Sequence, residues 1–239
     1  MPHGRSLLRL YADSVIDLIF PRYCPCCGQV LGAAETMICA ECLVTLPYTR
    51  ITDHSDNLVA RLFWGRLPVE KAYSHLFYNR ESLSFPLLMK LKYGHLPEIG
   101  RVMGRTMAGQ LRPKGFFDGV DGIVATPLHW WRWWLRGYNQ SGMMARGISQ
   151  ITGIPVLWGL VRRRRFTGTQ SHLDAELRRK NVENAFRAGR TDAKHILLVD
   201  DVLTTGATLL FVATAILKEN PDVHFSILTL SVASDGMPY

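Results

Sequence analysis

The segment HILLVDDVLTTGAT, residues 195–208, restricts the fold of this 239-residue chain more than any other. Its aliphatic run shows no polar alternation, so we expect a strand over His195–Val199 that is buried on both faces. Two acidic residues and a hydroxyl-rich turn follow, and then a helix is expected over Gly206–Glu219. Such strands belong to parallel sheets covered by helices. The segment therefore predicts an α/β fold, a mostly parallel sheet flanked by helices, with a ligand site at the carboxyl ends of its strands.

Strand-like and helix-like segments alternate along the rest of the chain, which is typical of parallel strands joined by helical connections. The other expected strands are Val69–Tyr78, Gly122–Ala125, Val156–Val161 and Val223–Leu230. The other expected helices are residues 1–20, Asp56–Phe63, Ser82–Lys92 with Ser82 as its N-cap, Leu96–Leu111 and Asn139–Ile151. Residues 166–186 are polar and charged, and we expect a mobile loop that merges into a helix around Ala175–Val182.

The residues after the central strand suit a sugar phosphate. A helix N-terminus offers unpaired N–H groups and a partial positive charge to a phosphate. Gly206 lets the backbone approach closely, and the threonines within Thr204–Thr208 add hydroxyl donors. Asp200 and Asp201 would repel a phosphate, so hydrogen bonds from ribose hydroxyls suit them better. Helix capping alone needs only one such side chain, and the pattern therefore favours a binding site.

Four of the five cysteines form two C-x-x-C pairs, Cys24 with Cys27 and Cys39 with Cys42. Four thiolates in this arrangement give a closed tetrahedral zinc site of a structural kind. The alternatives are a redox motif, which usually has a single pair at a helix start, or unconnected core cysteines. Two pairs favour zinc in a reducing compartment. Cys26 is surplus, and it remains an alternative to Cys24 as the first ligand.

The zinc pattern divides the chain into residues 1–50, an N-terminal helix with a tetracysteine zinc ribbon, and residues 51–239, the α/β domain. The N-terminal helix is amphipathic, because Arg9, Asp13 and Asp17 interrupt its apolar run. It therefore matches neither a signal peptide nor a transmembrane helix. We expect a cytoplasmic protein that is not an integral membrane protein.

The formal net charge is +8, and most of it lies in one stretch: residues 126–190 hold twelve Lys and Arg against three acids. A solvated basic face would explain this excess, but its position beside the expected phosphate site favours binding of an anion. The arginines that we consider for nucleic-acid contacts are Arg132, Arg162, Arg163, Arg164 and Arg165. The tryptophans of Trp130–Trp134 either stack on bases around Arg132 or fill a core or a seam between domains.

Residues 196–208 resemble the thirteen-residue signature of the type I phosphoribosyltransferases. Together with the two cysteine pairs, the PLH turn at Pro127–His129 and the RGYNQS stretch at Arg136–Ser141, they make the chain resemble the ComF/GntX family of phosphoribosyltransferase-like proteins from about residue 20 to residue 232. The chain departs from the usual family pattern at Thr126, where Val is common, and at Trp130–Trp134, where basic residues are common.

The resemblance implies a type I phosphoribosyltransferase-like fold that binds phosphoribosyl pyrophosphate or a related ribose phosphate together with magnesium. Asp200 and Asp201 would hold the ribose hydroxyls. The 5′-phosphate would lie against Leu203, Thr204, Thr205, Gly206, Ala207 and Thr208. Thr126, Pro127 and Leu128 are candidates for the pyrophosphate loop, and Arg136 joins the two acids as a candidate catalytic residue.

The resemblance also implies a role in natural competence, in which single-stranded DNA is imported and a competence helicase or the uptake machinery is a partner. Two alternatives stay open. One is an active phosphoribosyltransferase on an unidentified nucleobase-like or amine acceptor, in which arginine and magnesium stabilise the leaving pyrophosphate. The other is a structural adaptor that keeps the fold without any ligand.

Overall fold

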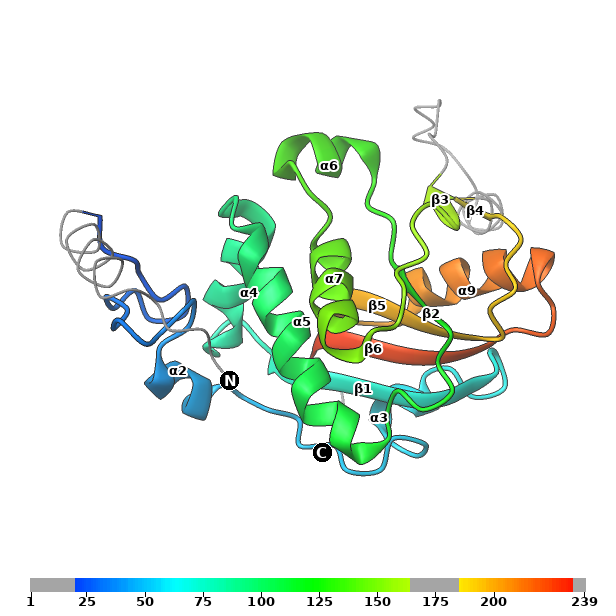
Figure 1. Ribbon diagram of the computed structural model, residues 1–239, viewed down its shortest axis with the longest axis horizontal. Coiled ribbons are helices and arrows are strands. Elements are labelled where there is room, and N and C mark those ends of the chain that lie inside the picture. The colour runs from blue at the N-terminus through cyan, green and yellow to red at the C-terminus, as the bar shows by residue number, and fades with distance from the viewer. Residues whose placement is uncertain (1–19, 164–184, 234–239) are drawn as a thin grey trace.

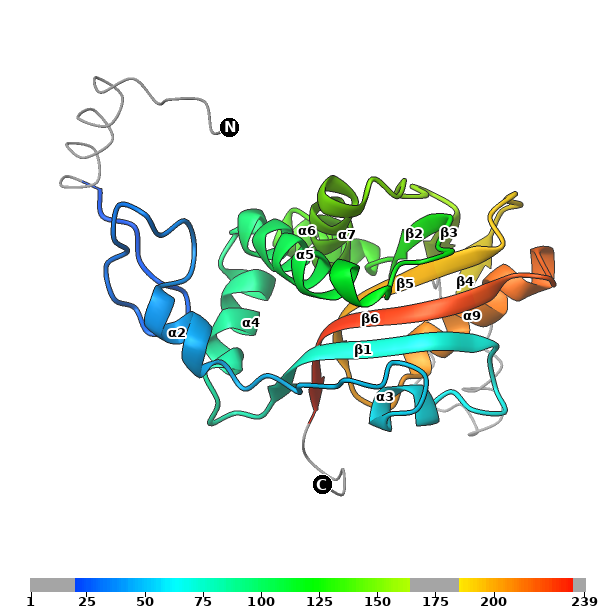
Figure 2. The same cartoon turned by 60° about the horizontal axis from the view of Figure 1, so that its bottom comes forward.

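A computed structural model describes residues 20–163 and 185–233. Within them, four strands form a parallel sheet in the order β1-β6-β5-β2 (Figures 1 and 2). The strands are β1 (Val69–Tyr78), β2 (Gly122–Ala125), β5 (His195–Leu203) and β6 (His224–Ala233). The expected mostly parallel sheet flanked by helices is thus confirmed. The expected helix at residues 1–20, most of the expected loop at 166–186, and Arg164 and Arg165 lie outside the described residues.

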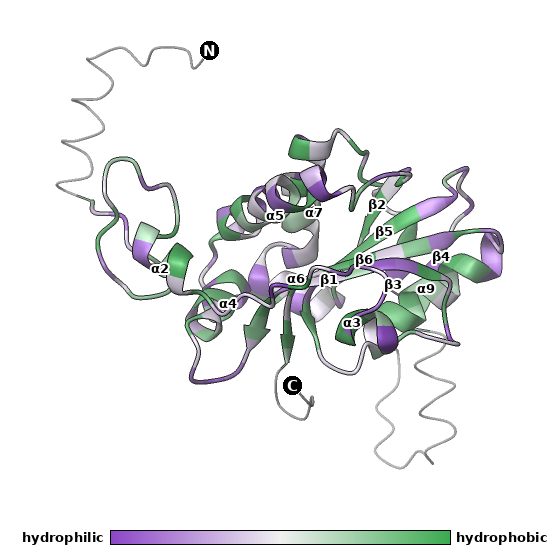
Figure 3. Cartoon of the chain, turned by 90° about the horizontal axis from the view of Figure 1, so that it is seen from below, coloured by the Kyte–Doolittle hydropathy of each residue, from purple (hydrophilic) through white to green (hydrophobic). Residues whose placement is uncertain are grey.

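Alternate residues of β5 pack on opposite faces of the sheet. Leu197 and Val199 join the core beneath α4 (Ser84–Tyr93), α5 (Pro97–Leu111) and α7 (Gln140–Thr152). Ile196 and Leu198 join the core beneath α3 (Leu58–Arg61) and α9 (Ala207–Glu219). Figure 3 shows that α9 is largely hydrophobic. All four side chains are fully buried. Each contributes about 1.5–3 kcal/mol to folding, which fixes the carboxyl end of β5 within a rigid layer.

Two glycines allow α5 and α7 to cross closely. A Cβ on Gly104 would lie 2.2 Å from the carbonyl oxygen of Met144, and one on Gly147 would lie 2.2 Å from that of Arg101. At its other end α7 begins after Asn139, whose Oδ1 accepts a hydrogen bond from Gly142 N and caps the helix. Asn139 Nδ2 also donates to Thr126 O at 2.9 Å, which places the first turn of α7 beside the end of β2.

The prediction of a strand at Val156–Val161 is wrong. Val156 alone bridges Ile123 of β2 in parallel, and the chain then turns at Gly159, which has a φ of +79°. That left-handed conformation ends any strand at this point. Strand β3 (Val161–Arg163) starts only afterwards and pairs antiparallel with β4 (Phe186–Ala188).

The helix starts also differ in places from expectation. Ser82 does not cap α4: the N-cap is Leu83, and the Ser82 hydroxyl donates to the carbonyl oxygen of Asn79 instead. Helix α3 is shorter than expected because Asn57 caps it. The Oδ1 of Asn57 accepts hydrogen bonds from Val59 N and Ala60 N. Helix α6 (Trp130–Arg136) and the short 3-10 helix η1 (Arg112–Lys114) were not expected.

The cysteine-bearing segment lies beside α4, at one end of the sheet (Figure 1). It includes α2 (Ala40–Thr45) and continues into residues 47–49, which run antiparallel along β1. Phe77 N donates to Pro47 O at 2.7 Å, and Thr49 N donates to His75 O at 3.1 Å. Across residues 20–163 and 185–233, no helix is long and apolar enough to cross a bilayer.

Candidate functional sites

A cleft of about 250 Å³ opens at the carboxyl ends of β2 and β5. It brings together the acidic pair, two threonines of the hydroxyl-rich turn, the candidate pyrophosphate loop and three of the arginines singled out in the sequence. It is lined by Lys92, Thr126, Pro127, Leu128, Arg132, Arg136, Gln140, Ser141, Arg163, Asp200, Asp201, Val202, Thr204 and Thr208. Most of the sequence-predicted residues of this region therefore share one cavity, and Leu203, Thr205, Gly206 and Ala207 line the small hollow beside it.

Strand β5 continues to Leu203, four residues beyond its expected end, so both acids belong to the strand itself. The turn that follows requires Gly206, which has a φ of +73° and a position where a Cβ would meet Phe63 Cζ at 2.9 Å. Gly206 is also the N-cap of α9, and no side chain caps this helix. The first N–H groups of α9 therefore face the small hollow within residues 202–209 that adjoins the cleft.

Asp200 is buried, and its Oδ1 accepts hydrogen bonds from Ser141 Oγ at 3.1 Å and from Asp201 N at 2.9 Å. Burial and, secondly, the charge of Asp201 raise the pKa of Asp200 to about 7. Asp201 forms an ion pair with Lys92, with Nζ 3.4 Å from Oδ2. Asp200 and Asp201 together thus carry a labile proton near neutral pH, and a bound cation would release it.

Arg136 is buried at 7% exposure, and among the described residues it forms no ion pair with an acid. One guanidinium nitrogen donates to Gln140 Oε1 at 3.1 Å, and the group stacks over Tyr93 at 5.1 Å from the ring centroid. Within the described part of the chain, Arg136 Nε and Gln140 Nε2 have no hydrogen-bond partner. A buried cation without a counter-ion is costly, so this arrangement is suited to an anion entering the cleft.

Two further arginines line the mouth of the cleft. Arg132 belongs to α6 and Arg163 to β3, where it stacks over Phe186 at 5.3 Å. Partial burial and then the charges of Arg163 and Arg132 lower the pKa of His129. Arg162 is exposed on β3 and is not part of the cleft lining.

Three tryptophans of α6 face solvent. Trp131, Trp133 and Trp134 are 51%, 55% and 69% exposed, so the core-filling alternative is wrong for these three. Trp131 and Trp134 stack on each other, with ring centroids 5.5 Å apart. Helix α6 projects from the top of the molecule in Figure 1, and its Arg132 and Arg136 line the cleft.

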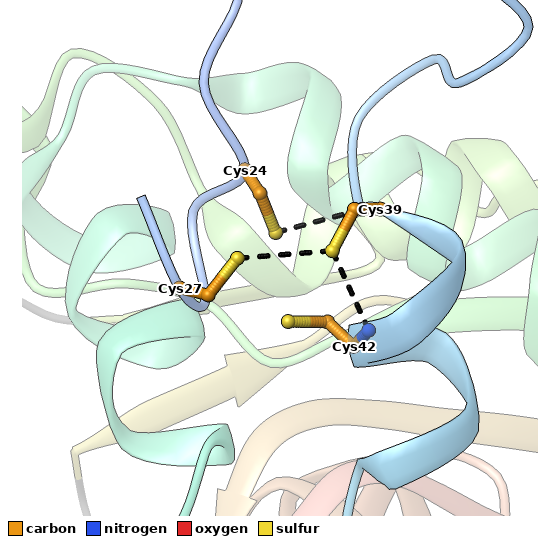
Figure 4. Close-up of side chains that lie close together, drawn as sticks. All are labelled: Cys24, Cys27, Cys39 and Cys42. Carbon is orange, nitrogen blue, oxygen red and sulfur yellow. Dashed lines mark hydrogen bonds between the residues drawn. The ribbon is translucent and has the colours of Figure 1, made fainter. Parts of the chain in front are cut away.

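The four paired cysteines converge. Their sulfur atoms all lie within 4.8 Å of one another (Figure 4), and Cys27 Sγ is 3.7 Å from Cys39 Sγ. Sulfur atoms around a shared tetrahedral zinc lie about 3.8 Å apart, since each Zn–S bond is about 2.3 Å. Cys39 also caps α2 by accepting a hydrogen bond from Cys42 N. The cluster can therefore hold a metal ion such as zinc.

The cluster contains Cys24 and not Cys26, which favours Cys24 as the first ligand. Burial opposes ionisation of Cys24, but hydrogen bonds from the backbone N–H groups of Cys39, Cys27 and Cys26 outweigh it and lower its pKa to about 6. Burial raises the pKa of Cys26 to about 12. The electrostatics thus favour a thiolate at Cys24 and a thiol at Cys26.

Several cleft residues escaped the sequence reasoning. Lys92 ends α4 and looks like an ordinary solvated lysine in a helix, and its approach to Asp201 depends on how that helix packs. Gln140 and Ser141 were noticed only within the RGYNQS stretch. Their position in the first turn of α7 is the local signal that could have marked them, because helix starts commonly line ligand sites.

The geometry defines an α/β protein with a polar, partly cationic cleft at its strand ends and a separate four-cysteine metal cluster. No protein-family model matches the chain. It is 34% identical over 204 residues to DNA utilization protein YhgH of Escherichia coli (strain K12), covering 82% of this chain and 84% of that protein. It is 37% identical over 199 residues to Competence protein F of Haemophilus influenzae (78% and 86%), and 32% identical over 197 residues to YhgH of Salmonella typhimurium (82% and 78%). The chain belongs to the ComF/GntX family.

Proposed function

We propose that this chain binds phosphoribosyl pyrophosphate or a related ribose phosphate in the cleft, and single-stranded DNA on the surface beside it. The role would be in competence or DNA utilization, the terms in the names of its relatives. The observation that carries the proposal is Arg136, a buried cation without an acidic partner among the described residues, in the same cavity as Asp200 and Asp201.

The cleft lining combines acidic and basic side chains, and this combination suits a ribose phosphate. Asp200 and Asp201 accept hydrogen bonds from ribose hydroxyls, and the turn Leu203–Thr208 with the start of α9 holds the 5′-phosphate. The pyrophosphate lies toward Arg136 and the Thr126–Leu128 turn. Magnesium neutralises the pyrophosphate when bound, and it needs few protein ligands for this.

The exposed surface around α6 supplies what single strands need. Tryptophan rings stack on bases of any sequence at about 1–3 kcal/mol per base, and Trp133 and Trp134 are available for this. Arg132 and Arg162–Arg165 would contact the phosphates. Zinc in the cysteine cluster is structural in this scheme, the protein acts in the cytoplasm, and a competence helicase is its candidate partner.

Catalysis of phosphoribosyl transfer is the second candidate function, and the position of Arg136 favours it. A guanidinium beside the pyrophosphate stabilises the charge that develops as this group leaves. Release of pyrophosphate from phosphoribosyl pyrophosphate in the presence of candidate nucleobases or amines tests this reaction. A protein that binds the compound without releasing pyrophosphate is a binding protein rather than a transferase.

Thermal unfolding with phosphoribosyl pyrophosphate and Mg²⁺ tests the main proposal. Ligand at about 100 times its Kd stabilises a folded protein by about 2.7 kcal/mol, which corresponds to a rise in Tm of roughly 5–10 °C at this size. The rise should disappear in Arg136→Gln and in the double variant Asp200→Ala/Asp201→Ala. Asp192→Asn, which alters an exposed acid outside the cleft lining, is the matched control. Absence of any shift in the wild type rejects the proposed ligand and favours the adaptor without ligand.

Fluorescence anisotropy with a labelled single-stranded oligonucleotide tests the DNA surface. Arg132→Ala and Arg163→Ala should each weaken binding and reduce the slope of log K against log salt by about 0.7, one phosphate contact. Trp133→Ala/Trp134→Ala should weaken binding without changing that slope. Lys218→Ala, an exposed cation at the end of α9, is the control. Equal losses in all variants would show that only net charge matters.

A further inference from the structure

A second cluster of metal-binding side chains lies at the end of the sheet opposite the cleft. Glu70 is near the start of β1, His224 starts β6 and His195 starts β5. These strands are neighbours in the sheet, and His195 and His224 are directly paired in register. Parallel pairing thus places all three side chains at the same end of the sheet, although more than 100 residues separate Glu70 from the two histidines in the sequence.

The distances within the cluster match those around a shared ion. His224 Nε2 lies 3.0 Å from Glu70 Oε1, and His195 Nδ1 lies 3.6 Å from Glu70 Oε2. All three ligand atoms lie within 4.8 Å of one another. Ligand atoms at about 2.1 Å from a tetrahedral zinc lie about 3.4 Å apart. The 3.6 Å separation is too long for a hydrogen bond, so an ordinary Glu–His contact leaves His195 Nδ1 unexplained.

His195 has the supporting contacts of a metal ligand. It is buried, and its Nε2 lies 2.9 Å from Ser226 Oγ. If Nε2 donates to that oxygen, the lone pair of Nδ1 is directed at the cluster, as in many metal-binding histidines. Asp121 fixes the backbone at this point by accepting hydrogen bonds from His195 N at 2.9 Å and Lys194 N at 2.8 Å.

Space and charge at the cluster also suit a cation. Gly119 lies beside His195 Nδ1 and has no side chain to block this nitrogen. Even a Cβ added to Gly119 would lie 3.5 Å from it. Glu70 and His224 are about half and one third exposed, which leaves the remaining coordination positions open to water. Asp121 adds a second negative charge near the two histidines and helps to neutralise a divalent ion.

We propose that Glu70, His195 and His224 bind a divalent transition metal of the zinc class, separately from the four cysteines. Two imidazoles and one carboxylate suit Zn²⁺, Co²⁺ or Ni²⁺ rather than Mg²⁺ or Ca²⁺, which prefer oxygen ligands alone. The ion joins the amino-terminal ends of three neighbouring strands and so cross-links the sheet. It is a structural site, remote from the ribose-phosphate cleft.

The test titrates Ni²⁺ by calorimetry into the full chain, whose cysteine cluster has first been filled with one equivalent of Zn²⁺. We expect one further equivalent to bind, with a Kd at least tenfold weaker in Glu70→Gln and in His224→Asn. His95→Asn, which alters an exposed histidine elsewhere, should bind as the wild type does. Circular dichroism of each variant without Ni²⁺ checks that the partly exposed substitutions leave the fold intact.

The resonances of the histidine rings give an independent readout. Diamagnetic Zn²⁺ as the second equivalent should shift the ring signals of His195 and His224 and leave His95 unchanged. Binding of no second equivalent, or a second equivalent that both variants and wild type bind equally, overturns the proposal. Such a result would make the cluster a hydrogen-bonded ion pair only.

Discussion

Replacement of Asp200 by Asn should stabilise the folded protein while it removes ligand binding. The asparagine Oδ1 keeps both acceptor contacts, from Ser141 Oγ and from Asp201 N. What the variant loses is the negative charge, which in the wild type is buried next to a second acid. Asp200, which we propose to bind the ribose, therefore destabilises the folded protein in the absence of ligand.

The magnitude follows from the pKa. The pKa of Asp200 is raised from 3.8 to about 7 on folding, so the folded state binds the proton more tightly than the unfolded state. The corresponding stability is fully present below pH 3.8 and is lost as the pH rises through 7. At 1.36 kcal/mol per pKa unit, the charge costs about 4 kcal/mol at pH 8 and about 2 kcal/mol at pH 5. Asn avoids this cost at both values.

Urea unfolding of the zinc-loaded protein at pH 5 and pH 8 measures this difference. Asp200→Asn should exceed the wild type in free energy of unfolding by more at pH 8 than at pH 5, with a gap of about 2–3 kcal/mol between the two. Asp192→Asn, at an exposed position, should change stability by less than about 0.5 kcal/mol at either pH. A gain for Asp200→Asn that is the same at both pH values, or no gain at all, refutes the reasoning from burial.

Three further predictions concern backbone geometry and metal. Gly104→Ala should lower the free energy of unfolding by about 1–3 kcal/mol, because the added methyl group meets the α7 backbone. Gly109→Ala in the same helix should raise it by up to about 1 kcal/mol, because a Cβ there meets nothing within 4 Å. Equal effects of the two substitutions in urea unfolding would contradict the close crossing. Gly206→Ala should cost more than about 1 kcal/mol in the same assay, since φ is +73°, and a neutral effect would show that the turn relaxes. Cys24→Ser should weaken the cobalt–thiolate charge-transfer absorption of Co²⁺-loaded protein, because one of four thiolates is lost, and Cys26→Ser should leave it unchanged; the reverse outcome would exchange their roles.

Features written in a few adjacent residues could be predicted from the sequence. The bounds of β1 and β2 were predicted correctly, since apolar runs end there at turn residues. The cysteine pairs also converge as expected, because C-x-x-C spacing largely dictates the local turn. The expected strand at Val156–Val161 failed because apolar composition does not reveal the left-handed Gly159.

The composition of the cleft was harder to predict, because much of it comes from tertiary packing. Lys92 and Tyr93 end one helix and Arg136 ends another, and nothing in either helix shows that these ends meet. The tryptophans of α6 gave no better signal, since large aromatic residues usually pack inside and these three do not. The partners of His195 at the far edge of the sheet are likewise supplied by strands distant in sequence.

Residues 47–57 protect the outer edge of β1. Besides the contacts at Pro47 and Thr49, Ala72 N donates to His54 O at 2.7 Å, and Asn57 Nδ2 donates to Ala72 O at 2.9 Å. An uncovered edge strand is a template for pairing between molecules. Because this cover begins directly after the cysteine cluster, metal loss that releases the segment would expose β1. Metal-depleted protein should therefore self-associate through β1 before its core unfolds, so metal supply would limit its solubility as well as its fold.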